Sequence, residues 1–134
     1  MTGDLSSGAS KFVDGSKRIY LNDKSLDFYK ISWEDDKTMK DDADKLDFVS
    51  GYAMTDPFED FAESYAYYIL HGTEFRLLTR YNQEIKQKYN YLKNEVFAGN
   101  EFINGNPVIT NMKISSRDYD VTVLPYDLSK FFII

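Results

Sequence analysis

The sequence contains no cysteine and a single histidine, His71. Without cysteine the chain cannot form a disulfide, a thiolate zinc finger or a cysteine nucleophile. A Ser-His-Asp catalytic triad would have to use His71, and no Gly-x-Ser-x-Gly segment is present to carry its serine. We interpret His71 as a helix-capping residue, because an imidazolium at the end of a helix interacts favourably with the helix dipole.

Positive charge and long apolar runs are also lacking. The formal net charge is −6, and the isoelectric point is about 4.7. Binding to nucleic acid or to an anionic membrane requires basic surface, so we expect neither partner. No apolar stretch approaches the roughly 18 residues of a membrane-spanning helix. We expect no export signal in the first ten residues, which are small and polar.

Aromatic side chains, in contrast, are abundant, with 11 tyrosines and 10 phenylalanines among 134 residues. Such a composition is typical of a globular chain, and the length fits one domain. Residues 34–47 hold seven acids against three lysines, which favours a solvated loop. A calcium-binding loop is the alternative for this segment, but its aspartate spacing fits the EF-hand pattern poorly.

Short β-hairpins are expected toward both ends of the chain. An Asp-Gly pair between two apolar segments predicts a hairpin over residues 11–21. Residues 108–114 and 119–124 have the pattern of two further strands joined by a turn. Residues 25–33 are apolar, but the run is too short to distinguish a helix from a strand.

Two helices are expected in the centre. A helix over residues 56–71 has Asp56 as its cap, proline in the first helical position and Gly72 after its end. Apolar residues at three- and four-residue steps predict a second helix over about residues 74–97. Because only Gly72-Thr73 would separate the two helices, we expect them to form a helical hairpin.

The predicted fold class is therefore α+β, with a central helical hairpin (about residues 57–97) flanked by short β-hairpin segments. We divide the chain into a flexible lead-in (residues 1–10), a main domain (residues 11–97) and a loop and β-hairpin extension (residues 98–134).

Two glutamates near the start of the first helix are the candidate functional residues. Glu59 follows Asp56 by three residues, so one interpretation is a capping box, in which Glu59 folds back onto the backbone. Glu63 is four residues further on and shares a helix face with Glu59. The helical wheel places this pair with Ala66 and Leu70, away from a polar side formed by Asp60, Ser64 and His71. Carboxylates beside an apolar stripe need a metal, a cation or several hydrogen bonds to stay charged.

The segment over residues 48–66 resembles a known family. It contains Tyr52, then Thr-Asp-Pro, then a helix that opens with Glu-Asp-Phe-Ala-Glu, in which the glutamates are Glu59 and Glu63. This pattern is similar to the third-ligand region of gluzincin-type zinc metallopeptidases, most closely the anthrax-lethal-factor-like peptidases. Tyr52 and Glu59 are seven residues apart, as in that family. The resemblance extends over about residues 27–97.

The resemblance implies three roles. Glu59 would be the third protein ligand of zinc, and Glu63 would orient a ligand histidine through its second ring nitrogen. Tyr52 would donate its phenolic O–H to the oxyanion that forms when water attacks a peptide carbonyl.

The family's other two ligands and its general base belong to an HExxH motif, which this sequence lacks. We therefore expect a C-terminal portion of a zinc endopeptidase, inactive alone, with zinc as cofactor only where the missing segment is present. The full-length enzyme would act on a peptide or protein substrate. The absent helix would leave an apolar groove that favours a homodimer. The alternative is a non-catalytic protein-binding or scaffold domain that keeps the helix for packing.

Overall fold

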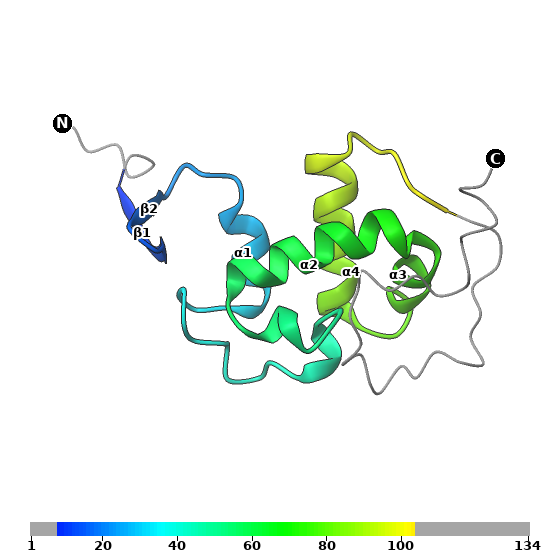
Figure 1. The fold of residues 1–134 in the computed structure, drawn as a ribbon, viewed down its shortest axis with the longest axis horizontal. Helices are drawn as coiled ribbons and strands as arrows, with labels where there is room; N and C mark the ends of the chain where they lie inside the picture. Colours follow the sequence, from blue (N-terminus) through cyan, green and yellow to red (C-terminus); the bar gives the residue numbers. More distant parts are fainter. Residues whose placement is uncertain (1–7, 104–134) are drawn as a thin grey trace, which may run out of the picture.

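The computed structural model describes residues 8–103. Within that range the chain forms a two-stranded antiparallel β-hairpin and four α-helices, the α+β fold that the sequence predicts. Figure 1 shows the hairpin at one end of the longest axis and the helices grouped along the rest of it. No helix in this range is long and apolar enough to cross a membrane.

The hairpin predicted around the Asp-Gly pair is present. Strand β1 (Ala9–Asp14) pairs with β2 (Lys17–Tyr20), and the register shifts between Ala9 and Val13. The turn contains Gly15 at φ +63°, a left-handed conformation that glycine adopts without steric penalty. One face of the hairpin is buried through Phe12 and Ile19.

The undecided segment over residues 25–33 contains a helix, α1 (Leu26–Ser32). Its Tyr29 ring lies 5.6 Å from the ring of Phe12 in β1, which attaches the hairpin to the helices. Leu26 and Phe28 are buried as well. Tertiary packing therefore settles what the short apolar run left open.

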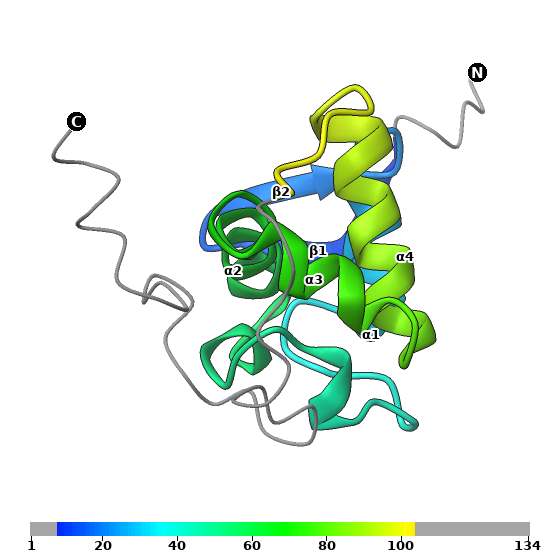
Figure 2. The ribbon, with the colours of Figure 1, turned by 90° about the vertical axis from the view of Figure 1, so that its right-hand side faces the viewer.

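The central helix α2 (Pro57–Leu70) begins where the sequence predicts. The Asp56 carboxylate oxygen Oδ1 accepts hydrogen bonds from the backbone N–H groups of Phe58 and Glu59, at 3.0 and 2.8 Å. The helix ends at His71, whose backbone N–H donates to the carbonyl of Tyr67 at 2.8 Å. In Figure 1, α2 runs through the middle of the molecule, and Figure 2 shows it end on, to the left of α4. It contacts the other three helices.

The prediction of one continuous second helix is wrong. The chain instead forms α3 (Gly72–Leu78), then α4 (Gln83–Tyr91), which continues into a π-helical turn (Leu92–Val96). Asn82 starts α4, because its Oδ1 accepts a hydrogen bond from the Ile85 N–H at 2.8 Å. Apolar residues continue at three- and four-residue steps on both sides of this break, so their spacing does not reveal it.

The predicted Gly72-Thr73 connection is the first turn of α3, so His71 alone separates α2 from α3. A Cβ atom at Gly72 would collide with the carbonyl oxygen of Phe102. Glycine is therefore required here by the close approach of two backbone segments.

Aromatic rings fill much of the core. The Phe28 ring of α1 meets the Phe61 ring of α2 edge to face at 5.1 Å. At the other end of α2, the Tyr68 ring stacks on Phe97 at 4.7 Å. Residues far apart in the sequence thus hold the four helices together through ring contacts, which stabilise beyond the area that they bury.

Residues 1–7 and 104–134 lie outside the described residues. The strands predicted over residues 108–114 and 119–124 fall there, as do most of the lead-in and most of the predicted C-terminal extension.

Candidate functional site

Tyr52 lies on a short helical turn directly before α2. The turn, η3 (Tyr52–Met54), packs beside α2 and lies below that helix in Figure 1. Its middle residue, Ala53, is fully buried, whereas the Tyr52 side chain is 59% exposed. The turn therefore presents a phenol to solvent on a base that is fixed in the core.

The structure brings Tyr52, Glu59 and Glu63 together at the start of α2. The Tyr52 side chain lies close enough to the Glu59 carboxylate to affect its pKa. Partial burial raises the pKa of Glu59 above its ordinary value, and the charges of Asp56, Glu63 and Asp14 raise it further, while Tyr52 acts in the opposite direction. A carboxylate in such surroundings is stabilised by a proton or by a cation.

Only one half of the predicted capping box is present. Asp56 accepts backbone hydrogen bonds from the first turn of α2. The Glu59 side chain, in contrast, interacts with Tyr52. Helix capping by Asp56 therefore leaves the Glu59 carboxylate at the surface of the turn.

Glu63 is held by a serine that the sequence interpretation did not single out. The Ser50 hydroxyl donates to Oε1 of Glu63 at 2.8 Å, and the same hydroxyl accepts the Ala53 N–H at 3.2 Å. Ser50 is 2% exposed. It connects the turn that carries Tyr52 to the helix that carries both glutamates.

The predicted polar side of α2 is the buried side, which corrects the helical-wheel interpretation. Asp60 and Ser64 are fully buried and His71 is 3% exposed, whereas Leu70, on the predicted apolar face, is 38% exposed. The reason is that residues from other elements supply partners for the buried polar groups, which a wheel for a single helix does not include.

Asp60 forms a fully buried ion pair with Lys88 of α4. The Lys88 Nζ lies 2.9 Å from Oδ2 of Asp60, and both side chains are completely shielded from solvent. The Trp33 indole N–H donates to the same oxygen at 3.1 Å, and the Ser64 hydroxyl donates to Oδ1 at 3.4 Å. Burial raises the pKa of Asp60, while Lys88 and the hydrogen bonds act to lower it.

Lys88 also anchors the segment that leads to Tyr52. Its Nζ donates to the backbone carbonyl of Asp47 at 2.8 Å and lies 4.0 Å from the centre of the Phe48 ring. The Asp47 carboxylate accepts from the Asn82 amide at 2.7 Å and from the Asp44 N–H at 3.0 Å. Asp47 therefore belongs to the core, although the acidic segment as a whole was interpreted as a solvated loop.

The sequence interpretation missed this buried network entirely. One available signal was the single tryptophan, since a buried indole N–H usually needs an acceptor. Another was the position of Lys88, which directly precedes Tyr89, a residue of the predicted apolar stripe. Neither signal identifies Asp60 as the partner, because the two charges are 28 residues apart.

The described residues do not form a complete zinc site. Within residues 8–103, no group of three or more His, Cys, Asp or Glu side chains is arranged to hold a metal ion. Catalytic zinc sites use three protein ligands. Glu59 alone would leave such a site short of protein ligands.

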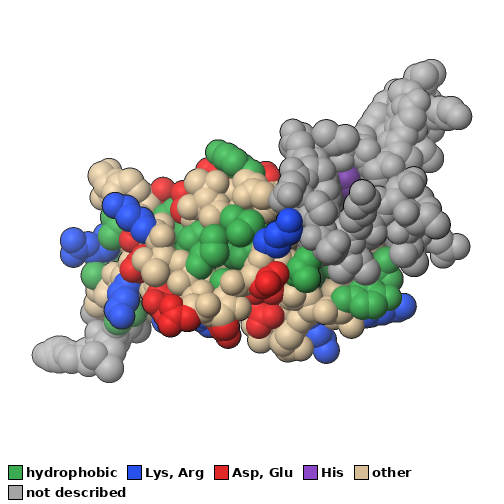
Figure 3. Space-filling view, turned by 90° about the horizontal axis from the view of Figure 1, so that it is seen from below, with side chains coloured by type: hydrophobic (Ala, Val, Ile, Leu, Met, Phe, Trp, Pro, Cys, Tyr) green, Lys and Arg blue, Asp and Glu red, His purple; other side chains and the backbone are tan. Residues whose placement is uncertain are grey.

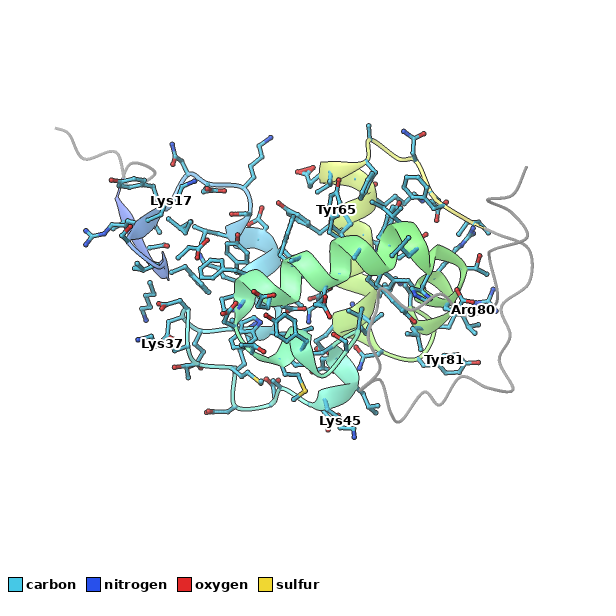
Figure 4. All side chains as sticks on the ribbon, in the orientation of Figure 1. Lys17, Lys37, Lys45, Tyr65, Arg80 and Tyr81 are labelled. Atoms are coloured by element: carbon cyan, nitrogen blue, oxygen red, sulfur yellow. The ribbon has the colours of Figure 1, made fainter. Side chains whose placement is uncertain are left out.

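We compared three hollows on the described surface with the apolar groove predicted beside Glu59, and none of them is that groove. These hollows are lined by the hairpin, by residues 30–47 and by the start of α4, and none of them is lined by Tyr52, Glu59 or Glu63. Figure 3 shows acidic and hydrophobic side chains intermixed on the face seen from below. In Figure 4, Tyr65 points from the upper side of α2 toward the end of α4, while Lys45 lies on the opposite, lower side.

No protein-family model matches the chain, and it has no match among the curated proteins or the solved structures. The side chains around Tyr52 are therefore the basis for a functional proposal.

Proposed function

We propose that this chain is the C-terminal portion of a zinc-dependent metalloendopeptidase domain and is inactive without an HExxH helix. Glu59 supplies one zinc ligand and Glu63 orients a ligand histidine. Tyr52 donates a hydrogen bond to the oxyanion of the peptide substrate. With one histidine in the sequence, the chain cannot supply the other two ligands itself.

One observation carries this proposal: the side chains of Tyr52, Glu59 and Glu63 gather at the solvent-facing start of α2. Tyr52 and Glu63 both lie close enough to the Glu59 carboxylate to change its pKa, which Tyr52 lowers and the charge of Glu63 raises. The raised pKa of Glu59 supports the proposal further, because a nearby cation would relieve the repulsion among these carboxylates.

The test begins with the coding DNA upstream of the Met1 codon, within roughly 100 codons, the span of one domain. We expect an in-frame HExxH motif there. The extended protein should contain zinc and cleave peptides. Glu59→Gln should lose zinc, while Tyr52→Phe should keep zinc and lower kcat by about 10²–10³-fold, the usual effect of removing one oxyanion donor.

Glu95→Gln is the matched control, because Glu95 is an exposed carboxylate in the π-helical turn. It should change neither zinc content nor kcat. An upstream region with no HExxH motif, or zinc content that does not depend on Glu59, would favour the non-catalytic scaffold domain instead.

A further inference from the structure

Ser50 links two of the proposed functional side chains through a single hydroxyl. It lies two residues before Tyr52 and donates to Oε1 of Glu63 at 2.8 Å. The same oxygen accepts the N–H of Ala53, the residue after Tyr52, at 3.2 Å. Tyr52 therefore lies within a short loop of backbone that the Ser50 hydroxyl closes against α2.

The chain on either side of this loop is fixed independently. Upstream, the Asp47 carbonyl accepts from Lys88 and the Asp47 carboxylate accepts from Asn82. Downstream, Asp56 caps α2. Between these anchors, the Ser50 hydroxyl joins the Tyr52 turn to Glu63 on α2 through hydrogen bonds.

The bond also leaves part of Glu63 available. Ser50 uses Oε1, and among the described residues no hydrogen-bond donor occupies Oε2. A carboxylate held through one oxygen keeps a defined direction for the other, which is the arrangement that a residue orienting an imidazole requires.

We propose that Ser50 is a positioning residue that sets Tyr52 and Glu63 in their places around Glu59. The inference rests on the proposed function for the roles of Tyr52 and Glu63. Ser50 itself touches no substrate, because it is 2% exposed. Its hydroxyl sets the separation between the turn and the helix.

The experiment is a nuclear Overhauser measurement on the 134-residue chain, with the cross-peak between the Tyr52 ring and the Glu59 side chain as readout. Ser50→Ala should lose this cross-peak, and Ser50→Thr, which keeps the hydroxyl, should restore it. Glu63→Ala breaks the same bond from a partly exposed position and should lose the cross-peak too.

Ser25→Ala is the matched control. The Ser25 hydroxyl also donates to a carboxylate, that of Asp23 at 2.6 Å, but it does so at the start of α1. This variant should keep the cross-peak between Tyr52 and Glu59. Persistence of the cross-peak in both Ser50→Ala and Glu63→Ala would overturn the proposal, and so would its loss in Ser25→Ala, which would indicate general loosening.

A second readout separates this inference from the proposed function. In the extended protein, Ser50→Ala should lower kcat and leave KM nearly unchanged, because substrate binding does not require the Ser50 hydroxyl. A wild-type extended protein with neither zinc nor cleavage would contradict the proposed function, while the cross-peak result would still decide whether Ser50 positions Tyr52.

Discussion

At the scale of single residues, the Asp60–Lys88 pair raises an energetic question, because both charges are fully buried. Removing two charges from water costs several kcal/mol each, and their attraction offsets this only when their remaining hydrogen bonds are also satisfied. Trp33, Ser64 and the Asp47 carbonyl satisfy them here. The pair is thus part of a network in which the loss of one member removes a partner from a buried charge.

We expect Lys88→Met to lower the free energy of unfolding by about 3–5 kcal/mol, because Asp60 would be left as an uncompensated buried charge. The double variant Asp60→Asn with Lys88→Met should lose less than the sum of the two single variants. Urea denaturation followed by circular dichroism measures all of these changes.

Lys93→Met provides the comparison for this prediction. Lys93 lies 3.8 Å from Glu101 in an ion pair, and its side chain is 37% exposed. Exposed pairs contribute at most about 1 kcal/mol. Equal decreases in the free energy of unfolding for Lys88→Met and Lys93→Met would contradict the prediction that the buried pair contributes more to stability.

Residue-level prediction from the sequence worked where the determinants are local. The cap at Asp56 follows from its own neighbours, and the structure contains it. Asp60 could not be placed in the same way, because its burial depends on Lys88 and Trp33, 28 and 27 residues away. The grouping of Glu59 with Glu63 followed from helix geometry, but Ser50 required the fold of the preceding turn.

At the scale of elements, the break between α3 and α4 depends on Asn82, which acts twice. Its Oδ1 caps α4, and its amide nitrogen donates to the Asp47 carboxylate at 2.7 Å. One side chain therefore starts a helix and holds the segment that leads to the Tyr52 turn.

Asn82→Ala should accordingly destabilise the protein by about 1–2 kcal/mol, the upper range for loss of a helix cap, since Asp47 also loses a donor. Thermal unfolding monitored at 222 nm (the usual helix band) would measure this as a fall of several degrees in Tm. Asn90→Ala, at an exposed position on α4, should leave Tm unchanged or raise it slightly. A loss no larger for Asn82 than for Asn90 would show that the cap does not define α4.

Element boundaries were predictable where local signals mark them. Helix α2 has Asp56 and Pro57 at its start, and its beginning was placed correctly. The boundary at Asn82 was missed because the apolar period of α3 continues into α4, although Tyr81 within that period is 60% exposed. An asparagine cap in the middle of an apolar period was the signal that could have revealed it.

At the scale of the whole molecule, the hairpin and the helices differ in how they are held. The hairpin lies at one end and buries mainly Phe12 and Ile19. Helix α2, in contrast, contacts each of the other three helices. Regions with fewer buried apolar contacts open at lower free energy.

Native-state hydrogen exchange should therefore show lower protection for the amides of β1 and β2 than for those of Tyr67 and Tyr68 in α2. Exchange from the hairpin should also be insensitive to low concentrations of denaturant, as expected for local opening. Equal protection in both regions, with the same denaturant dependence, would mean that the hairpin and helices unfold as one unit.

The α+β class could be predicted for the whole molecule because local patterns, turn residues and caps determine it. The packing of α2 against α1 and α4 could not, since it depends on which aromatic rings meet, such as Phe28 and Phe61. The same limit applied to the candidate site: the motif proposed Tyr52, Glu59 and Glu63 as functional residues, while the serine and the lysine that hold their segments are found only in the tertiary structure.

Trp33 is the only tryptophan in the chain, is 2% exposed, and donates its indole N–H to Asp60. Excitation near 295 nm selects tryptophan over tyrosine, so the emission of the native protein comes from one chromophore beside the buried ion pair. The protein therefore contains its own optical probe. Its emission maximum and fluorescence lifetime report the hydration of the Asp60–Lys88 pair without any added label.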